Sequence, residues 1–150
     1  MTIYFADTSA LAKCYLHEIG SHWMRSITHP DNGNAVVISE LTPIEYFALL
    51  ARRVRDKSLT EINARILEQA FLQNYQQHYA SIELRNTILA EARHLVTRYP
   101  LRPPDAIQLA CAIDTRAIIN SPIIFLCSDV DLLSAARAEG FIVDDPNLHS

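Results

Sequence analysis

Five short strand candidates are spread along the chain, and helical stretches rather than hairpin turns separate them. They are the largely apolar runs Thr2–Ala6, Ala35–Ile38, Ile123–Cys127 and Phe141–Val143, and the more polar segment Ala80–Leu84. Strands that are joined through helices are expected to lie parallel in one sheet. The sequence therefore predicts an α/β fold with a central, mostly parallel β-sheet of four to five short strands flanked by helices.

Helix signals fill the intervals between these runs. Start signals stand at Ser39, at the Ser58–Glu61 capping box, at Pro103-Pro104 and at Ser128–Asp131. Gly140 is placed to end the last helix. The expected helices cover about 10–16, 21–28, 40–56, 61–78, 86–99, 105–118 and 129–139.

Length and composition fit a single domain over residues 1–150. A chain of this length buries roughly 68–70% of its unfolded surface when it folds. Its 49% hydrophobic residues are enough to form the core of such a domain. Cys14, Cys111 and Cys127 stand far apart among apolar neighbours and are expected to be free thiols. No N-terminal signal and no window of about 20 apolar residues is present, so we expect a cytoplasmic protein with no membrane segment.

The sequence lacks the motifs of several classes of enzyme. The chain has only three glycines, Gly20, Gly33 and Gly140, which are too far apart for a phosphate-binding loop or a dinucleotide fingerprint. His17 and Glu18 resemble the start of a zinc-protease helix, but position 21 is Ser instead of the second His. The G-x-S-x-G motif is also absent. No His-based nucleophilic device is therefore indicated.

Four carboxylates remain, at positions that a parallel sheet would bring together. Asp7 closes the first strand candidate and Asp129 follows the fourth in chain order, so both are expected at the carboxyl edge of the sheet, where ligands bind in α/β folds. Asp105 opens a nearly all-apolar helix that should start at the same edge. Glu45 is the single acid in the apolar stretch 41–50 and is expected to be at least partly buried.

Each acid also has a simpler role open to it. Asp7, Asp105 and Asp129 could serve only as helix caps or first-turn acids favoured by the helix dipole. Glu45 could be a solvated edge residue or pair with Arg52 or Arg53. Singly the four positions decide little, and it is their joint placement that favours a shared site.

A cluster of four carboxylates would require a cation. Two carboxylates about 4 Å apart repel each other by roughly 4 kcal/mol at an effective dielectric near 20, so the cluster must take up protons or bind a cation. Oxygen ligands alone select hard ions, which makes Mg²⁺ or Mn²⁺ the expected cofactor. Such an ion activates water and neutralises phosphate charge during phosphodiester cleavage, with no protein nucleophile.

Several segments, in order along the chain, resemble the motifs of the PIN domain. They are F-A-D-T-S-A-L at 5–11, S-E-L-T-P-I-E at 39–45, L-R-P-P-D-A-I-Q-L-A at 101–110, and F-L-C-S-D at 125–129 followed by A-A-R-A-E-G-F at 135–141. The likeness is greatest to VapC-type toxins of type II toxin–antitoxin pairs and spans nearly the whole chain. It implies a three-layer fold, Mg²⁺- or Mn²⁺-dependent RNA cleavage, a homodimer and a small VapB-like antitoxin.

The resemblance also implies roles for individual residues. The catalytic, metal-binding acids of the family match Asp7, Glu45, Asp105 and Asp129. The Ser or Thr of the first motif matches Ser9, which would orient Asp7. Members often carry Ser or Ala before the third acid and His three residues beyond it, where this chain has Pro104 and Gln108. Loop geometry and the lining of the site are expected to differ there.

Two further features each have two interpretations. Asp131 either shares the role of the fourth acid or caps the following helix with Ser128. The basic side chains Arg52, Arg53 and Arg55 either compensate the dipole at the end of a helix or contact the RNA backbone.

An antitoxin tail would have matching chemistry in this chain. A net charge of −4, with acids gathered at one edge, suits a basic peptide. Leu11, Tyr15 and Trp23 are candidates for the apolar part of that contact, with core packing as the alternative.

Other functions stay open at this point. A phosphatase of the haloacid dehalogenase type needs D-x-D after the first strand, but Ser9 takes the second place, and that spacing occurs only at Asp129 and Asp131. A phosphoacceptor domain needs a lysine late in the chain, and the two lysines are Lys13 and Lys57. A PIN nuclease of RNA processing and a non-catalytic RNA-binding module are further alternatives. The favoured prediction is a metal-dependent endoribonuclease, the toxin of a VapBC-type pair.

Overall fold

Five parallel strands form one sheet in the order β3-β2-β1-β4-β5. The computed structural model describes residues 1–150. The strands are β1 (Ile3–Ala6), β2 (Ala35–Ser39), β3 (Tyr79–Ile82), β4 (Ile124–Leu126) and β5 (Ile142–Asp144). The chain winds outward from β1 to β3 and then returns to β4, so β1 and β4 flank the switch point where α/β sheets open a crevice.

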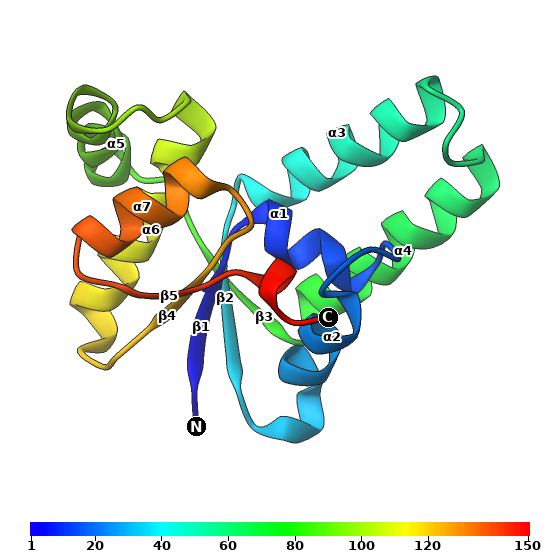
Figure 1. Ribbon diagram of the computed structural model, residues 1–150, viewed down its shortest axis with the longest axis horizontal. Helices are drawn as coiled ribbons and strands as arrows, with labels where there is room; N and C mark the ends of the chain where they lie inside the picture. The colour runs from blue at the N-terminus through cyan, green and yellow to red at the C-terminus, as the bar shows by residue number, and fades with distance from the viewer.

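Seven helices cover the two faces of the sheet (Figure 1). They are α1 (Thr8–Leu11), α2 (Ser21–Thr28), α3 (Thr42–Arg55), α4 (Glu61–Gln77), α5 (Asn86–Arg98), α6 (Pro103–Ile119) and α7 (Val130–Ala138). Three 3₁₀ turns, η1 (Ala12–Cys14), η2 (Pro30–Asn32) and η3 (Pro146–Leu148), complete the chain. Helices α5 to α7 cover one face and α1 to α4 the other, with α3 and α4 extending outward as a hairpin. The predicted α/β fold is confirmed.

Two hydrophobic cores result from the alternation of side chains along the strands. Phe5 and Phe125 stack at 5.7 Å between ring centroids and pack against α5, α6 and α7. The next residue in each strand, Ala6 and Leu126, faces the other layer, which contains α1 to α4. Both faces of the central strands are covered, which explains why β1, β2 and β4 are nearly continuous apolar runs, whereas the edge strands β3 and β5 have exposed positions.

Several element boundaries differ from the sequence prediction. Helix α3 begins at Thr42 rather than residue 40, because Ser39 belongs to β2 and its hydroxyl accepts from the Leu41 amide. Helix α4 is capped by Thr60 and not by Ser58. The spacing of apolar residues also predicts Ile44 on the buried face of α3, yet it is 68% exposed. None of the helices combines the length and apolarity that a membrane crossing requires.

Candidate active site

Four helix starts meet at the carboxyl edge of the sheet and bring the predicted acids into one cleft. Asp7 caps α1 directly after β1, and Asp129 caps α7 shortly after β4. Glu45 and Asp105 lie in the first turns of α3 and α6. The cleft measures about 240 Å³ and is lined by Asp7, Thr8, Ser9, Glu45, Leu49, Arg52, Arg102, Asp105, Gln108 and Asp129. Capping and site formation are therefore compatible roles, since helix N-termini favour carboxylates.

Asp7 is the most deeply buried of the four acids. Its Oδ1 accepts from Ser9 Oγ at 2.7 Å and from the Ala10 amide at 3.0 Å, and its Oδ2 accepts from Cys127 Sγ at 3.3 Å. Burial raises the pKa of Asp7 to about 6; the three hydrogen bonds oppose this rise and the charge of Asp105 adds to it. The contact with Ser9 agrees with the orienting role that the resemblance implies.

Glu45 is half-buried and anchored by residues that the sequence did not single out for that purpose. Its Oε1 accepts from Thr8 Oγ1 and from Gln108 Nε2, both at 2.7 Å. Glu45 forms no ion pair with Arg52 or Arg53, so the alternative of a simple surface pair is wrong. The only feature of the sequence that could have indicated this contact is the position of Gln108, one helical turn after Asp105.

Asp105 faces both a cation and other carboxylates. Arg102 Nε lies 3.3 Å from Asp105 Oδ2. Burial raises the pKa of Asp105, Arg102 lowers it, and the charges of Asp129 and Glu45 raise it further. These acids therefore influence one another electrostatically across the cleft, as expected for a shared site.

The basic residues divide between the cleft and other surfaces. Arg52 and Arg102 line the cleft, and Arg102 was missed by sequence reasoning. Arg53 pairs with Glu18 at 3.4 Å. Arg55 does not line this cleft and instead lines a separate pocket between α3 and α4.

Asp131 does not join the four acids. It is exposed and absent from the cleft lining. Asp129, rather than Ser128, is the N-cap of α7 and accepts from the Leu132 amide at 2.9 Å. The predicted cap formed by Ser128 and Asp131 is therefore wrong. The D-x-D spacing at 129–131 places only one of its two carboxylates in the cleft.

The donor set fits a hard cation, although no cage is preformed. No group of three or more His, Cys, Asp or Glu side chains lies close enough to hold a metal ion as the side chains stand. Four carboxylates nevertheless line one cleft, and burial disfavours the charge of Asp7 and of Asp105. The four acids outnumber the two arginines in the cleft, and carboxylate oxygens in net excess are ligands that Mg²⁺ and Mn²⁺ prefer.

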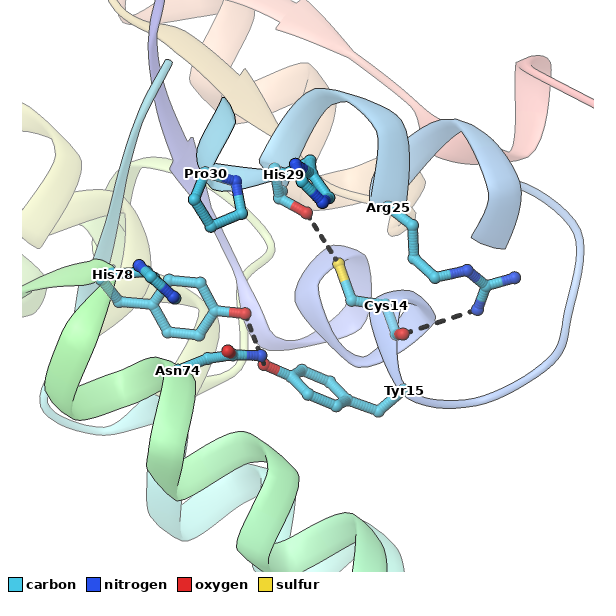
Figure 2. Close-up of a pocket in the computed structure, with 9 residues that line it drawn as sticks. Cys14, Tyr15, Arg25, His29, Pro30, Asn74 and His78 are labelled. Carbon is cyan, nitrogen blue, oxygen red and sulfur yellow. Dashed lines mark hydrogen bonds between the residues drawn. The ribbon is translucent and has the colours of Figure 1, made fainter. Parts of the chain in front are cut away.

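A second cleft, of about 330 Å³, shares no lining residue with the acidic cleft; Figure 2 shows its lining. Cys14 and Tyr15 line it together with Arg25 of α2, and no carboxylate takes part. The Tyr15 hydroxyl is bonded to Tyr79 and accepts from Asn74 Nδ2 at 2.8 Å. Tyr15 is thus part of an internal network.

The other two residues suggested for an apolar partner contact are also engaged within the protein. Leu11 is fully buried in the core. Trp23 stacks on His149 with 3.8 Å between ring centroids. Core packing, the simpler interpretation, is the one that the structure favours for the three residues.

A parallel sheet with acids at its carboxyl edge is the arrangement that the PIN domain resemblance implied. The sequence profile described as the PIN domain matches residues 4–137. The chain therefore belongs to the PIN domain family.

Individual proteins are also similar to this chain in sequence or in fold. The chain is 29% identical over 140 residues to ribonuclease VapC45 and to ribonuclease VapC49, both of Mycobacterium tuberculosis, with 93% of each chain covered. Its fold is similar to FitAcB from Neisseria gonorrhoeae, with a TM-score of 0.67, 14% identity and coverage of 95% of this chain and 97% of that one. It is also similar to VapBC2 from Rickettsia felis bound to a promoter DNA fragment, with a TM-score of 0.64, 12% identity and coverage of 96% and 98%.

Proposed function

We propose that this protein is a divalent-metal-dependent endoribonuclease of the VapC type, the toxin of a toxin–antitoxin pair. The observation that carries the proposal is the convergence of four carboxylates, each from a different helix start, on one cleft. Membership of the PIN family and the two relatives named as VapC ribonucleases support it. The absence of a His- or Ser-based device in the sequence agrees with cleavage that needs no protein nucleophile.

In this proposal the acids hold the cation and the arginines hold the substrate. Asp7, Glu45, Asp105 and Asp129 would bind Mg²⁺ or Mn²⁺. When bound, the ion supplies an acidic water and neutralises phosphate charge. Ser9 and the Ala10 amide keep Asp7 oriented.

Phosphate contacts are assigned to the two arginines that line the cleft. Arg52 and Arg102 provide positive charge within an otherwise acidic cleft, which offsets the repulsion of the RNA backbone. Arg53 is engaged with Glu18 and Arg55 lies outside the cleft. The substrate-binding role is therefore narrowed from the basic end of α3 to Arg52 and extended to Arg102.

The partners proposed are an antitoxin and a second copy of the chain. Structures similar in fold include VapBC2 and FitAB assemblies. A basic antitoxin tail would meet a cleft in which four carboxylates outnumber two arginines, and would compete there with the metal.

The test is RNA cleavage by the purified full-length protein, separated from any partner. Cleavage is expected with Mg²⁺ or Mn²⁺, is expected to stop with EDTA, and should be lost in Asp7→Asn and Asp105→Asn. Asp131→Asn is the matched control, because this acid neighbours Asp129 but is exposed outside the cleft. Metal-independent cleavage with 2′,3′-cyclic phosphate products would falsify the proposal. Hydrolysis of small phosphate esters, with RNA left intact, would favour the phosphatase alternative.

A further inference from the structure

Glu45 is anchored by side chains of two helices other than its own. Its Oε1 accepts from Thr8 of α1 and from Gln108 of α6. Its Oε2 has no hydrogen-bond partner within the protein, while Glu45 lines the acidic cleft. One carboxylate oxygen of Glu45 is therefore hydrogen-bonded within the protein, and the other can bind a ligand in the cleft.

The amide of Gln108 has one favourable orientation. Its Nε2 donates to Glu45 Oε1 at 2.7 Å and to Thr42 Oγ1 at 3.1 Å. Rotating the amide by 180° would set its Oε1 against Glu45 Oε1, two acceptors with no proton between them. The shortest contact therefore assigns the amide orientation.

This orientation has a cost for Gln108 itself. The side chain is buried, 1% exposed, and its Oε1 has no hydrogen-bond partner. A buried acceptor without a partner lowers the free energy of unfolding. The Gln108 amide donates to Glu45 and Thr42 but leaves its own oxygen unpaired. The arrangement therefore fixes the position of Glu45 at a cost in the stability of the fold.

The two anchors connect Glu45 to the other acids. Thr8 follows Asp7 directly, and Gln108 lies one helical turn after Asp105. A movement of α1 or α6 that displaced Asp7 or Asp105 would carry the donors of Glu45 with it. Such second contacts keep the acids of a site in mutual register.

We propose that Gln108 and Thr8 are positioning residues that hold Glu45 in register with Asp7 and Asp105 for RNA cleavage. The inference rests on the proposed ribonuclease function and adds two residues to it. Neither residue needs to touch the substrate. Each acts by donating a hydrogen bond to Glu45 Oε1.

The kinetic test uses near-isosteric variants that remove the donors. Gln108→Leu and Thr8→Val are expected to lower kcat for RNA about 10- to 100-fold, the usual effect of losing such a partner, with KM unchanged. Gln108→His and Thr8→Ser keep an N–H or O–H donor and should recover most of the lost kcat. Thr115→Val is the control, because this buried hydroxyl lies on the same helix and donates only to the Cys111 carbonyl.

A double-mutant cycle separates positioning from general damage. In the Glu45→Ala protein the acid to be positioned is gone, so adding Gln108→Leu should cause no further loss of kcat. A further loss equal to that seen in the wild type would overturn the proposal. So would a kcat of Gln108→Leu that matches Thr115→Val.

Crystal structures of the wild type and Gln108→Leu make the test independent of activity. The carboxylate of Glu45 is expected to leave its place beside Thr8 in the variant. If Glu45 stays in the same position, the positioning role is wrong even where the protein cuts RNA. If Glu45 moves but the wild type cuts no RNA, the ribonuclease proposal fails while the positioning of Glu45 stands.

Discussion

Cys127 Sγ donates to Asp7 Oδ2 at 3.3 Å and so links the carboxyl ends of the neighbouring strands β1 and β4. The same sulfur accepts from the Asp129 amide at 3.1 Å. The buried thiol of Cys127 thus contacts the side chain of one acid, Asp7, and the backbone of another, Asp129. The contact with Cys127 lowers the pKa of Asp7, against the larger effect of burial.

We predict that activity depends on the ionisation of Asp7. With a pKa of about 6, Asp7 becomes protonated as the pH falls through 6, and protons then compete with the metal. At subsaturating Mn²⁺, kcat/KM should therefore decline below about pH 6. Cys127→Ala removes a donor to the carboxylate and should move this decline to higher pH, whereas Cys127→Ser should not. Cys111→Ala is the control, since this buried thiol lies in the core away from the acids. An identical pH profile for Cys127→Ala would contradict the prediction.

Asp7 should also lower the stability of the metal-free protein at neutral pH. Its pKa rises from 3.8 in the unfolded chain to about 6 in the fold, so the folded state binds the proton more tightly. The resulting stabilisation is full below pH 3.8 and is lost by about pH 6, an upper estimate of about 3 kcal/mol at 1.36 kcal/mol per pH unit. Asp7→Asn, which does not ionise, should match the wild type near pH 4 and exceed its unfolding free energy at pH 7.5. Urea unfolding in EDTA measures both, and equal stabilities at pH 7.5 would contradict the prediction.

The sequence predicted the fold and the acids because both depend on patterns that are local in the chain. The central strands β1, β2 and β4 are short apolar runs, and Asp7 and Asp129 stand just after two of them. Winding to both sides of β1 then brings their ends together without further information. The start of α3 and the cap of α4 were less accurate, because α3 begins after Leu41 without a side-chain cap and Thr60, rather than the nearby Ser58, caps α4.

The partners of the acids could not be predicted in the same way. Thr8, Gln108 and Cys127 contact their acids across sequence separations of 37, 63 and 120 residues. Such contacts depend on how α1, α6 and β4 pack, which no local pattern specifies. The exposure of Ile44 is a related failure, because Tyr46 and Leu50 occupy the core beside it.

Arg102 is predicted to bind a substrate phosphate. It is exposed and paired only with Asp105 within the protein, so it is free to turn toward RNA. Arg102→Gln should raise KM about 3- to 10-fold, and the slope of log(kcat/KM) against log salt should become shallower by about 0.7 for the lost contact. Arg53→Gln, at an arginine that pairs with Glu18 outside the cleft, is the control and should keep both values. Equal effects of the two substitutions would argue against a specific role for Arg102.

Metal binding should appear as thermal stabilisation that depends on the acids and on pH. An ion that binds only the folded state at 100 times its Kd adds about 2.7 kcal/mol, so Mn²⁺ should raise the melting temperature of the wild type at pH 7.5. Asp105→Asn should abolish most of this rise, because it removes one of the four carboxylates that line the cleft. Asp131→Asn should keep the rise in melting temperature, since that acid is exposed outside the cleft.

At pH 5 the rise in melting temperature with Mn²⁺ should shrink, because protonation of Asp7, with its pKa of about 6, competes with the ion. A rise that is equal in the wild type and Asp105→Asn, or equal at both pH values, would place the metal outside this cleft.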